Sequence, residues 1–306
     1  MKKINLLTIM LALAMALVAC IPQTAEVTTQ IALVDGLERE VVLEKPAESV
    51  VSLASSNTEI LYAVGAGAQV VGRDSFSDYP SEALELTDIG GGFSEYDLET
   101  IVSLDPDLVL AAEINTPELV QSIEDLGITV FYIKNPTDFT DLYVTLQDIA
   151  MLTGHENETE ELIDSLKSRV AAIEEKIAKI KLKPTVFYEL DATDMAKPYT
   201  PGPGTFHNTI IGMAGGTNIG AALDTAWAQI SLEELLVQDP DFILLGDANW
   251  GITPESVTER EGWDTLTAVK EGKVLPFDDN LLSRPGPRLV DGLEELAKIF
   301  HPDLFD

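Results

Sequence analysis

The strongest constraint on the fold is a repeat inside the chain. Residues 98–110 read LETIVSLDPDLVL and residues 232–244 read LEELLVQDPDFIL, with six identities at a constant offset of 134. Each copy has a helical pattern, then Asp-Pro-Asp, then an apolar run typical of a buried strand. Proline cannot continue a helix and aspartate hydrogen-bonds turn backbone, so the motif marks a passage from helix to strand. The shared Leu-Glu start favours duplication over convergence on one turn, and it predicts two related lobes.

Short β-rich runs alternate with helical patterns on both sides of one long helical segment. Strands separated by helices indicate βαβ units and mainly parallel sheets. Before them, residues 31–43 alternate loosely around Asp35-Gly36, which is a hairpin signal. The predicted strands are 49–53, 69–72, 107–111, 129–133, 185–190, 241–245 and 274–277, and the predicted shorter helices are 58–64, 98–104, 117–126 and 290–300.

One apolar stripe of helical period separates the two halves of the chain. A helix over residues 157–182 would be about 39 Å long at a rise of 1.5 Å per residue, and Pro184 would end it. The stripe consists of Leu162, Leu166, Val170, Ile173, Ile177 and Ile180.

The N-terminus predicts export and a lipid anchor. Lys2 and Lys3 precede an apolar run over residues 4–18, which is shorter than the roughly 20 residues of a membrane span and is typical of a signal peptide. The sequence Leu-Val-Ala-Cys ending at Cys20 matches a bacterial lipobox, in which the cysteine carries lipid; a signal peptide with a chance cysteine is the alternative. Cys20 is the only cysteine, so the chain has no internal disulfide. We expect an extracytoplasmic protein anchored to the cell membrane.

These patterns divide the chain into five predicted parts, two of which are α/β lobes. The parts are a lipoprotein signal peptide (1–19), a lipidated tether with a short hairpin (20–47), an N-terminal α/β lobe (48–156), a connecting helix (157–183) and a C-terminal α/β lobe (184–306).

Composition limits the partners of the chain. Hydrophobic residues make up 45% of the sequence, which is typical of a globular protein. Aspartate and glutamate number 52 against 19 lysine and arginine residues, for a formal charge of −33. Such a surface repels nucleic acid and anionic lipid head groups, so we expect neither as a partner. We interpret the excess of acid as an adaptation for solubility or salt.

The sequence carries no pattern of a common enzyme. Walker A, Gly-x-Ser-x-Gly, His-Glu-x-x-His and Rossmann glycine motifs are all missing. The only histidines are His155, His207 and His301, and these cannot build a transition-metal site of several imidazoles. We therefore predict no catalytic residue, no metal ligand and no cofactor. Only His207 lies near predicted cleft sequence, and heme ligation by His207 or Tyr199 stays open.

Aromatic residues concentrate in loops rather than at periodic core positions. Rings in such loops suit a large flat ligand, because each supplies wide apolar area at little entropic cost. A cleft between two lobes is a common place for such a site. Packing of a loop against its own lobe is the alternative for any single ring. The loop aromatics are Phe76, Tyr79, Phe93, Tyr96, Tyr199, Trp227 and Trp250.

Five segments in order resemble one protein family. The chain is similar, from about residue 48 to its C-terminus, to the iron-siderophore and cobalamin class (class III) of periplasmic substrate-binding proteins of ABC importers. This resemblance implies an α/β fold of two Rossmann-like lobes with mainly parallel sheets, joined by one long rigid α-helix. The segments that carry it are 49–80, 97–111, 204–219, 230–244 and 284–302.

Within this family the chain most resembles the cobalamin-binding subgroup. The resemblance implies that Phe76, Phe93, Tyr199 and Trp227 hold the ligand, which would be cobalamin or a related corrinoid. Two positions depart from the subgroup pattern, because Phe76 and Phe93 stand where it uses tyrosine and tryptophan. A further cleft tryptophan of the subgroup appears here as Ala112.

Three other functions stay open at this point. A ferric-siderophore or heme receptor of the same family would recruit cationic groups, and Arg73, Arg284 and Arg288 are available. An enzyme on a related scaffold would need a cleft acid near His207, for which Asp191 and Asp194 are candidates. A surface protein used for adhesion would need no ligand cleft.

The resemblance also implies how the chain meets its transporter. In the family each lobe presents a glutamate to arginines of one permease subunit, and the matching residues are Glu99 and Glu233. These are also paired positions of the repeat, so one acid per lobe could meet a two-fold permease dimer. Ordinary acids favoured at helix N-termini are the alternative. We expect a monomeric receptor that binds a bulky small molecule and performs no catalysis.

Overall fold

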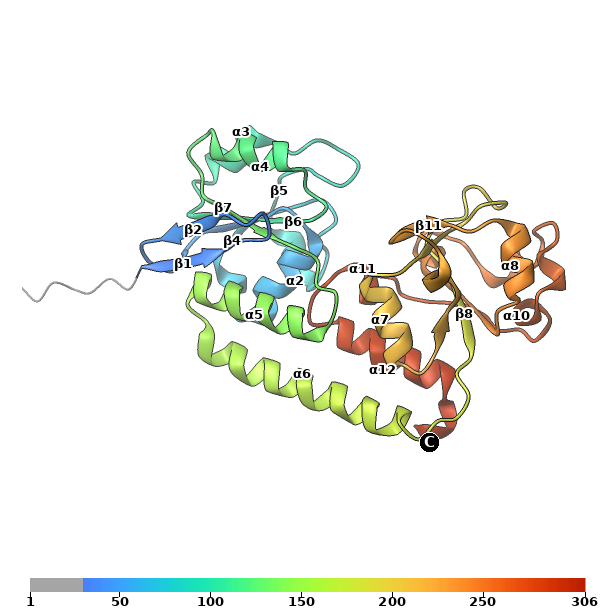
Figure 1. Ribbon diagram of the computed structural model, residues 1–306. Coiled ribbons are helices and arrows are strands. Elements are labelled where there is room, and N and C mark those ends of the chain that lie inside the picture. The colour runs from blue at the N-terminus through green and yellow to red at the C-terminus, as the bar shows by residue number, and fades with distance from the viewer. Residues whose placement is uncertain (1–29, 306) are drawn as a thin grey trace, which may run out of the picture.

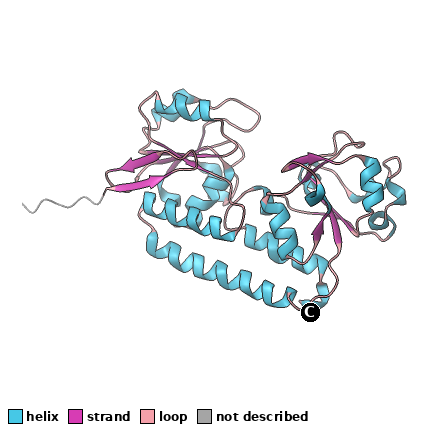
Figure 2. Ribbon diagram, in the orientation of Figure 1, coloured by secondary structure: helices cyan, strands magenta, loops and turns pink. Residues whose placement is uncertain are grey.

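The computed structural model describes residues 30–305, so the predicted signal peptide and Cys20 lie outside the described residues. The described chain forms two lobes side by side, with the long helix α6 (Glu156–Ile177) running beneath both of them (Figure 1). Each lobe contains a parallel sheet, and helices cover its faces (Figure 2). Within residues 30–305, no helix combines the length and the apolar character that a membrane crossing needs.

The N-terminal lobe has a five-stranded sheet in the order β5-β4-β3-β6-β7, and all its strand pairs are parallel. The predicted hairpin forms beside it from antiparallel β1 and β2. The elements are β1 (Ile31–Val34), β2 (Glu40–Leu43), β3 (Val50–Ser52), α2 (Ser55–Ala63), η1 (Ala66–Gln69), β4 (Val70–Arg73), η2 (Ser81–Glu85), β5 (Thr87–Asp88), α3 (Leu98–Ser103), β6 (Leu108–Ala112), α4 (Pro117–Glu124), β7 (Val130–Ile133) and α5 (Phe139–Thr153).

The C-terminal lobe has a four-stranded parallel sheet in the order β10-β8-β12-β13, and a separate antiparallel pair, β11-β9. The elements are β8 (Thr185–Glu189), β9 (Tyr199–Pro201), α7 (Phe206–Met213), β10 (Thr217–Asn218), η3 (Ile219–Ala222), β11 (Trp227–Gln229), α8 (Leu232–Gln238), β12 (Phe242–Leu245), η4 (Gly246–Trp250), α9 (Pro254–Thr258), η5 (Trp263–Thr265), α10 (Thr267–Lys270), β13 (Val274–Pro276), α11 (Asn280–Ser283), α12 (Leu289–Phe300) and η6 (Pro302–Leu304).

The connection between the lobes differs from the predicted one, which was a single helix over residues 157–182. A helix that the sequence pattern did not reveal, α5, precedes α6, and the two lie side by side after a turn at Gly154 (Figure 1). Gly154 adopts a φ of 78°, which favours glycine and ends α5. Helix α6 ends at Ile177, seven residues before Pro184, so it is about 33 Å long.

The predicted apolar stripe is nevertheless the buried face of α6. Leu166, Val170, Ile173 and Ile177 are buried, whereas Ile180 lies beyond the end of the helix. These residues belong to one apolar cluster that continues into α5 on the N-terminal side and into α7 and α12 on the C-terminal side. The core of the molecule therefore passes from one lobe to the other along α6.

The two copies of the repeat occupy equivalent places. Each ends in a central strand, β6 or β12, and the second aspartate of each turn binds the start of the neighbouring strand. Oδ2 of Asp107 accepts hydrogen bonds from the backbone N and Oγ of Ser49 at 3.0 and 3.1 Å. Oδ2 of Asp241 accepts from the backbone N and Oγ1 of Thr185 at 2.7 and 2.9 Å. The predicted relation between the halves is confirmed at the level of side-chain contacts.

Candidate functional site

A cavity of about 630 Å³ lies between the two lobes. Its N-terminal wall comes from segments that follow the carboxyl ends of four parallel strands. Leu53 follows β3, Asp74 and Phe76 follow β4, Glu113 and Ile114 follow β6, and residues 134–137 follow β7. Ligands of open parallel sheets bind outside these strand ends, and the volume lies in the range of small-molecule sites.

The opposite wall comes from three parts of the C-terminal lobe. These are the start of α7, the strand β11 and the segment that follows α11. Thr205 caps α7 by accepting a hydrogen bond from the backbone N of Asn208 at 3.2 Å, which places Phe206 and His207 at the cavity. Trp227 projects from β11 and its ring centroid lies 5.5 Å from that of His207.

The structure brings three of the four predicted ligand-binding rings to this region. Phe76 and Trp227 line the cavity from opposite lobes. Phe93 does not line it but packs edge-to-face on Phe76, with ring centroids 5.1 Å apart. Tyr199 lies on β9 opposite Gln229 and is absent from the cavity wall.

Sequence patterns missed several apolar residues of the wall, among them Ile114 and Phe206. Ile114 is 80% exposed and follows β6 by two residues. One signal in the sequence could have identified Ile114, namely its position just beyond a predicted buried strand. The carboxyl ends of parallel strands share one edge of a sheet, where ligands bind. Phe206 starts α7 and packs edge-to-face on Phe139 of the other lobe, at 5.3 Å.

His207 is buried and engaged in a hydrogen-bonded group behind the wall. Its Nε2 lies 3.3 Å from Oγ of Ser283 and 3.6 Å from Oδ1 of Asp279, which also accepts a hydrogen bond from the hydroxyl of Tyr188 at 2.6 Å. Burial opposes ionisation of Asp279, but these hydrogen bonds hold its pKa below the usual range. The group supports the wall, and His207, although it lines the cavity, is only 2% exposed.

The acids proposed for an enzyme have other roles. Asp191 accepts a hydrogen bond from the backbone N of Thr193 at 2.7 Å, and Asp194 accepts one from the backbone N of Ala196 at 3.0 Å. Both therefore shape turns, and the acid beside His207 is Asp279 instead. Among residues 30–305, no three His, Cys, Asp or Glu side chains gather closely enough to hold a metal ion.

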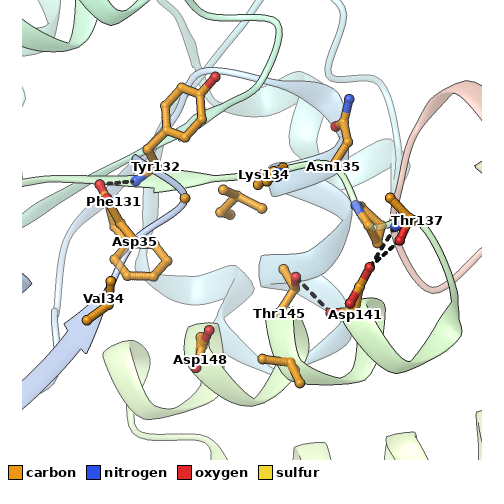
Figure 3. A pocket seen from close by; sticks show the side chains of 14 residues that line it. Val34, Asp35, Phe131, Tyr132, Lys134, Asn135, Thr137, Asp141, Thr145 and Asp148 are labelled. Atoms are coloured by element: carbon orange, nitrogen blue, oxygen red, sulfur yellow. Dashed lines mark hydrogen bonds between the residues drawn. The ribbon is translucent and has the colours of Figure 1, made fainter. Parts of the chain in front are cut away.

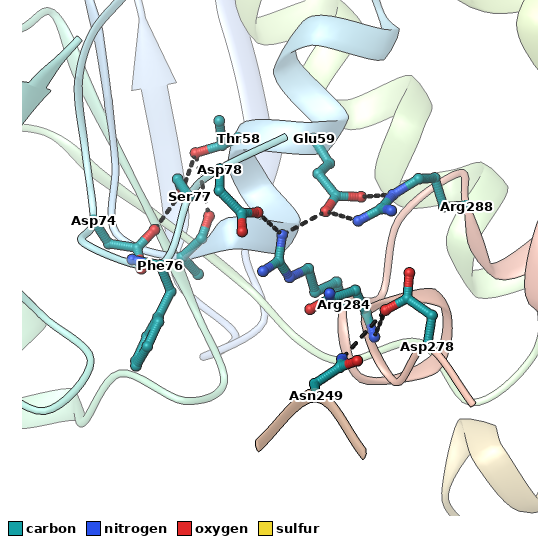
Figure 4. A network of polar contacts seen from close by, with 12 residues as sticks. Thr58, Glu59, Asp74, Phe76, Ser77, Asp78, Asn249, Asp278, Arg284 and Arg288 are labelled. Carbon is teal, nitrogen blue, oxygen red and sulfur yellow. Dashed lines mark hydrogen bonds and ion pairs between the residues drawn. The ribbon is translucent and has the colours of Figure 1, made fainter. Parts of the chain in front are cut away.

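The arginines considered for an anionic ligand are all engaged in ion pairs. Arg73 pairs with Asp88 at 3.2 Å inside the N-terminal lobe. Arg284 and Arg288 reach across from the C-terminal lobe to Glu59 of α2, at 3.2 and 2.5 Å (Figure 4). Arg284 also pairs with Asp78 at 2.5 Å.

The contacts of Glu59 form an ion-paired bridge between the lobes. Its side chain is 2% exposed, and both partner arginines are also largely buried. Removal of one member of such a buried group would leave an uncompensated charge, so the group fixes the spacing of the lobes. The guanidinium of Arg288 additionally stacks on the ring of Tyr79 at 4.1 Å.

A second, smaller cavity of about 360 Å³ lies within the N-terminal lobe, between the hairpin and α5 (Figure 3). It shares residues 134–137 with the cavity between the lobes. Asp148 lies at its edge, and burial raises the pKa of this carboxyl to about 6. Because one lobe supplies all the lining residues, this cavity does not report on the spacing of the lobes.

The predicted docking acids occupy matching places on the two lobes. Glu99 and Glu233 are exposed in the first turns of α3 and α8, whose N-caps are Asp97 and Ser231. Both helices lie on the side of the molecule away from α6 (Figure 1). The arrangement gives each lobe one exposed acid on a comparable helix.

Two α/β lobes with a cavity of ligand size between them are typical of a solute-binding protein. The profile of the periplasmic binding protein family matches residues 50–281, and the chain belongs to this family. Its members are solute-binding proteins rather than enzymes, and they serve ABC importers with permease partners. The predicted family, fold class and absence of enzyme function are confirmed.

Individual relatives differ in the ligand that their names give. The chain is 33% identical over 274 residues to an uncharacterised ABC transporter substrate-binding lipoprotein of Bacillus subtilis, covering 89% of this chain and 85% of that protein. It is 31% identical over 279 residues to a cobalamin-binding protein of Halobacterium salinarum, covering 87% and 73%. A periplasmic heme-binding protein from Roseiflexus, in apo form, superimposes with a TM-score of 0.75 at 27% identity, covering 84% and 99%.

Proposed function

We propose that this chain is the extracytoplasmic receptor of an ABC importer for cobalamin or a related corrinoid. The observation that carries the proposal is the pair of rings, Phe76 and Trp227, that face one cavity from opposite lobes. A corrin ring system is large and flat, and aromatic side chains offer it apolar area at low entropic cost. The cobalamin-binding relative from Halobacterium salinarum supports this choice.

The polar groups of the cavity favour a corrinoid over the two related ligands. A ferric siderophore carries anionic groups, yet Arg284 at the wall is already paired with Glu59 and Asp78. Heme would need an axial ligand, yet His207 is buried against Asp279 and Tyr199 stands outside the wall. The same arrangement leaves the ring-lined surface available to a ligand whose metal is already coordinated.

Delivery to the permease would use the two lobes together. We propose that Glu99 and Glu233 each meet arginines of one permease subunit, because both acids are exposed on matching helices. Lipid on Cys20 would hold the receptor, working as a monomer, at the membrane.

Calorimetric titration of the purified chain with cyanocobalamin, hemin and ferrioxamine B tests the ligand. We expect saturable binding of cyanocobalamin at one site, with weaker binding in Trp227→Ala because the ring that covers one face is lost. The matched control is Leu182→Ala, an exposed apolar residue in the loop after α6. Saturable binding of hemin or ferrioxamine B without binding of cyanocobalamin would contradict the proposal.

A further inference from the structure

Three aromatic rings from the two lobes meet at one edge of the cavity. Phe76 and Phe93 come from loops of the N-terminal lobe, and Trp250 is the last residue of η4 in the C-terminal lobe. The ring centroid of Trp250 lies 5.9 Å from that of Phe93 and 6.4 Å from that of Phe76, both edge-to-face. These distances fall in the range of favourable aromatic pairs. Rings of the two lobes therefore contact each other here.

The exposure of the rings places this cluster between the cavity and solvent. Phe76 lines the cavity and is 37% exposed, whereas Phe93 is 87% exposed and Trp250 is 68% exposed. Both outer rings are largely exposed, and each packs edge-to-face on the other and on Phe76. Large apolar side chains this exposed are typical of a binding surface.

The N-terminal side of the cluster is built to hold Phe76 in place. The backbone N of Phe76 donates a hydrogen bond to Oδ2 of Asp74 at 3.0 Å, and Asp74 is itself buried (Figure 4). The ring packs directly over Gly92, where a Cβ atom would lie 2.2 Å from Cε2 of Phe76. Any larger residue at position 92 would displace the ring.

The C-terminal side anchors the turn rather than the ring of Trp250. Nδ2 of Asn249 donates a hydrogen bond to Oδ1 of Asp278 at 3.2 Å, immediately before Trp250 in sequence (Figure 4). Gly251 follows with a φ of 94° and ends η4. The backbone that carries Trp250 is thus fixed, while its side chain can rotate about its own χ angles.

We propose that Phe76, Phe93 and Trp250 form a ring gate, closed by contacts among the three rings and opened by rotation of Trp250. A ligand that passes must separate the rings, and only a ligand with a wide apolar surface replaces the contacts that are lost. Trp250 therefore determines specificity for bulky ring ligands from the C-terminal lobe. The identity of the ligand rests on the proposed function. The contacts among the three rings are observed in the structure and do not depend on it.

The first test needs no ligand. In a Trp227→Phe background, Trp250 is the only exposed tryptophan, because Trp263 is 0% exposed. We expect Phe93→Ala to shift the emission of Trp250 to the red and to increase its quenching by acrylamide, since one face of the indole loses its partner. Leu182→Ala in the same background should change neither quantity. Equal quenching with and without Phe93 would overturn the gate.

The second test measures rates with cyanocobalamin as the probe, by stopped-flow fluorescence of Trp227. We expect Trp250→Ala to raise both the association and the dissociation rate constants by about three- to tenfold, because an open gate hinders neither entry nor exit of cyanocobalamin. Trp250→Phe should keep rates near the wild-type values, since a ring remains. An unchanged association rate constant in Trp250→Ala would contradict the gate, even if dissociation were faster.

The two tests separate failure of the gate from failure of the proposed function. A wild-type chain that does not bind cyanocobalamin contradicts the corrinoid proposal, and the acrylamide experiment still decides the gate. If the chain binds cyanocobalamin but Phe93→Ala leaves the acrylamide quenching of Trp250 unchanged, the proposed function stands and the gate is contradicted.

Discussion

The two lobes are alike at one end of their sheets and different at the other. At the amino ends of β6 and β12, both lobes carry the same Asp-Pro-Asp turn with the same hydrogen bonds to a neighbouring strand. At the carboxyl ends, the strands of the N-terminal lobe lead into the cavity wall, whereas the central strands of the C-terminal lobe lead to a buried ionic group outside that wall. Because the shared turn binds the start of a neighbouring strand in each lobe, the end that is alike serves the fold.

The clearest divergence concerns one acid that follows the repeat in both halves. Glu113 and Asp247 each lie six residues after the last aspartate of the motif. Glu113 is exposed and accepts a hydrogen bond from the backbone N of Asn135 at 2.8 Å. Asp247 is buried beside Glu189, which pairs with Arg260 at 2.5 and 2.8 Å.

The segments around these two acids differ as well. In the C-terminal lobe Asp247 belongs to η4, the turn that carries Trp250, and Glu189 is the last residue of β8. In the N-terminal lobe the strand end leads directly into the cavity wall at Ile114. A ligand with two unlike faces would meet two unlike surfaces, which the duplicated scaffold alone would not provide.

The prediction with the largest expected effect tests whether both lobes contribute equally to binding of the permease. We predict that Glu99→Lys combined with Glu233→Lys reduces uptake of labelled cyanocobalamin at least about tenfold, because both acid–arginine contacts become repulsive. Each single reversal should give an intermediate rate, and equal rates for the two would show equal use of the lobes. Uptake by cells that carry the cognate permease is the measurement.

The control for this experiment reverses two exposed acids elsewhere. Glu160→Lys with Glu161→Lys makes the same change of net charge on α6, away from α3 and α8. Uptake should stay at the wild-type rate, and cyanocobalamin affinity should be unchanged in all these variants. Full uptake by the Glu99/Glu233 double variant would refute the docking proposal.

The second prediction concerns the buried acid of the C-terminal lobe. Burial, and after it the charge of Glu189, raise the pKa of Asp247 from 3.8 to about 7. Between these values the folded chain holds a proton that the unfolded chain has lost, so this group makes stability fall as pH rises from 4 to 7. We predict that Asp247→Asn is more stable than wild type at pH 8 by about 2–4 kcal/mol and gains little at pH 4.

Urea unfolding at several pH values measures this difference. Glu113→Gln is the matched control, because the equivalent acid of the other lobe is exposed. Its stability should follow the wild-type pH profile. If Asp247→Asn and wild type lose stability in parallel between pH 4 and 8, Asp247 does not hold a proton in the folded chain.

Most of the fold was predictable because it depends on periodic burial. Apolar period and turn chemistry located α6 and the longer parallel strands, since each buries a regular face. They missed β5 and β10, which have only two residues each. Helix α5 was missed, although its residues Leu142, Leu146 and Ile149 are buried at helical spacing. The end of α6 was misplaced because Pro184 is a stop signal, whereas the helix stops earlier at Ile177.

The site was less predictable because it depends on contacts between distant segments. Loop aromatics pointed correctly to Phe76 and Trp227 as residues of the cavity wall. No sequence pattern showed that Glu59 would bind Arg284 and Arg288, more than 200 residues away, and so occupy the arginines considered for an anionic ligand. Nor did the sequence show that the ring of Trp250 would meet the two phenylalanines across the gap, because that contact depends on how the lobes are spaced.

The prediction with the smallest expected effect tests the Asp-Pro-Asp turns, which are alike in the two lobes. Asp107→Ala and Asp241→Ala each remove a carboxylate that accepts backbone and hydroxyl hydrogen bonds at the start of a central strand pair. We predict that each lowers the free energy of unfolding by about 1–2 kcal/mol, and that the double variant shows the sum, because the two turns lie in separate lobes. Asp224→Ala, in an exposed loop, should have no measurable effect. A large inequality between the two turns, measured by urea unfolding, would mean that the repeated motif no longer has the same structural role in both lobes.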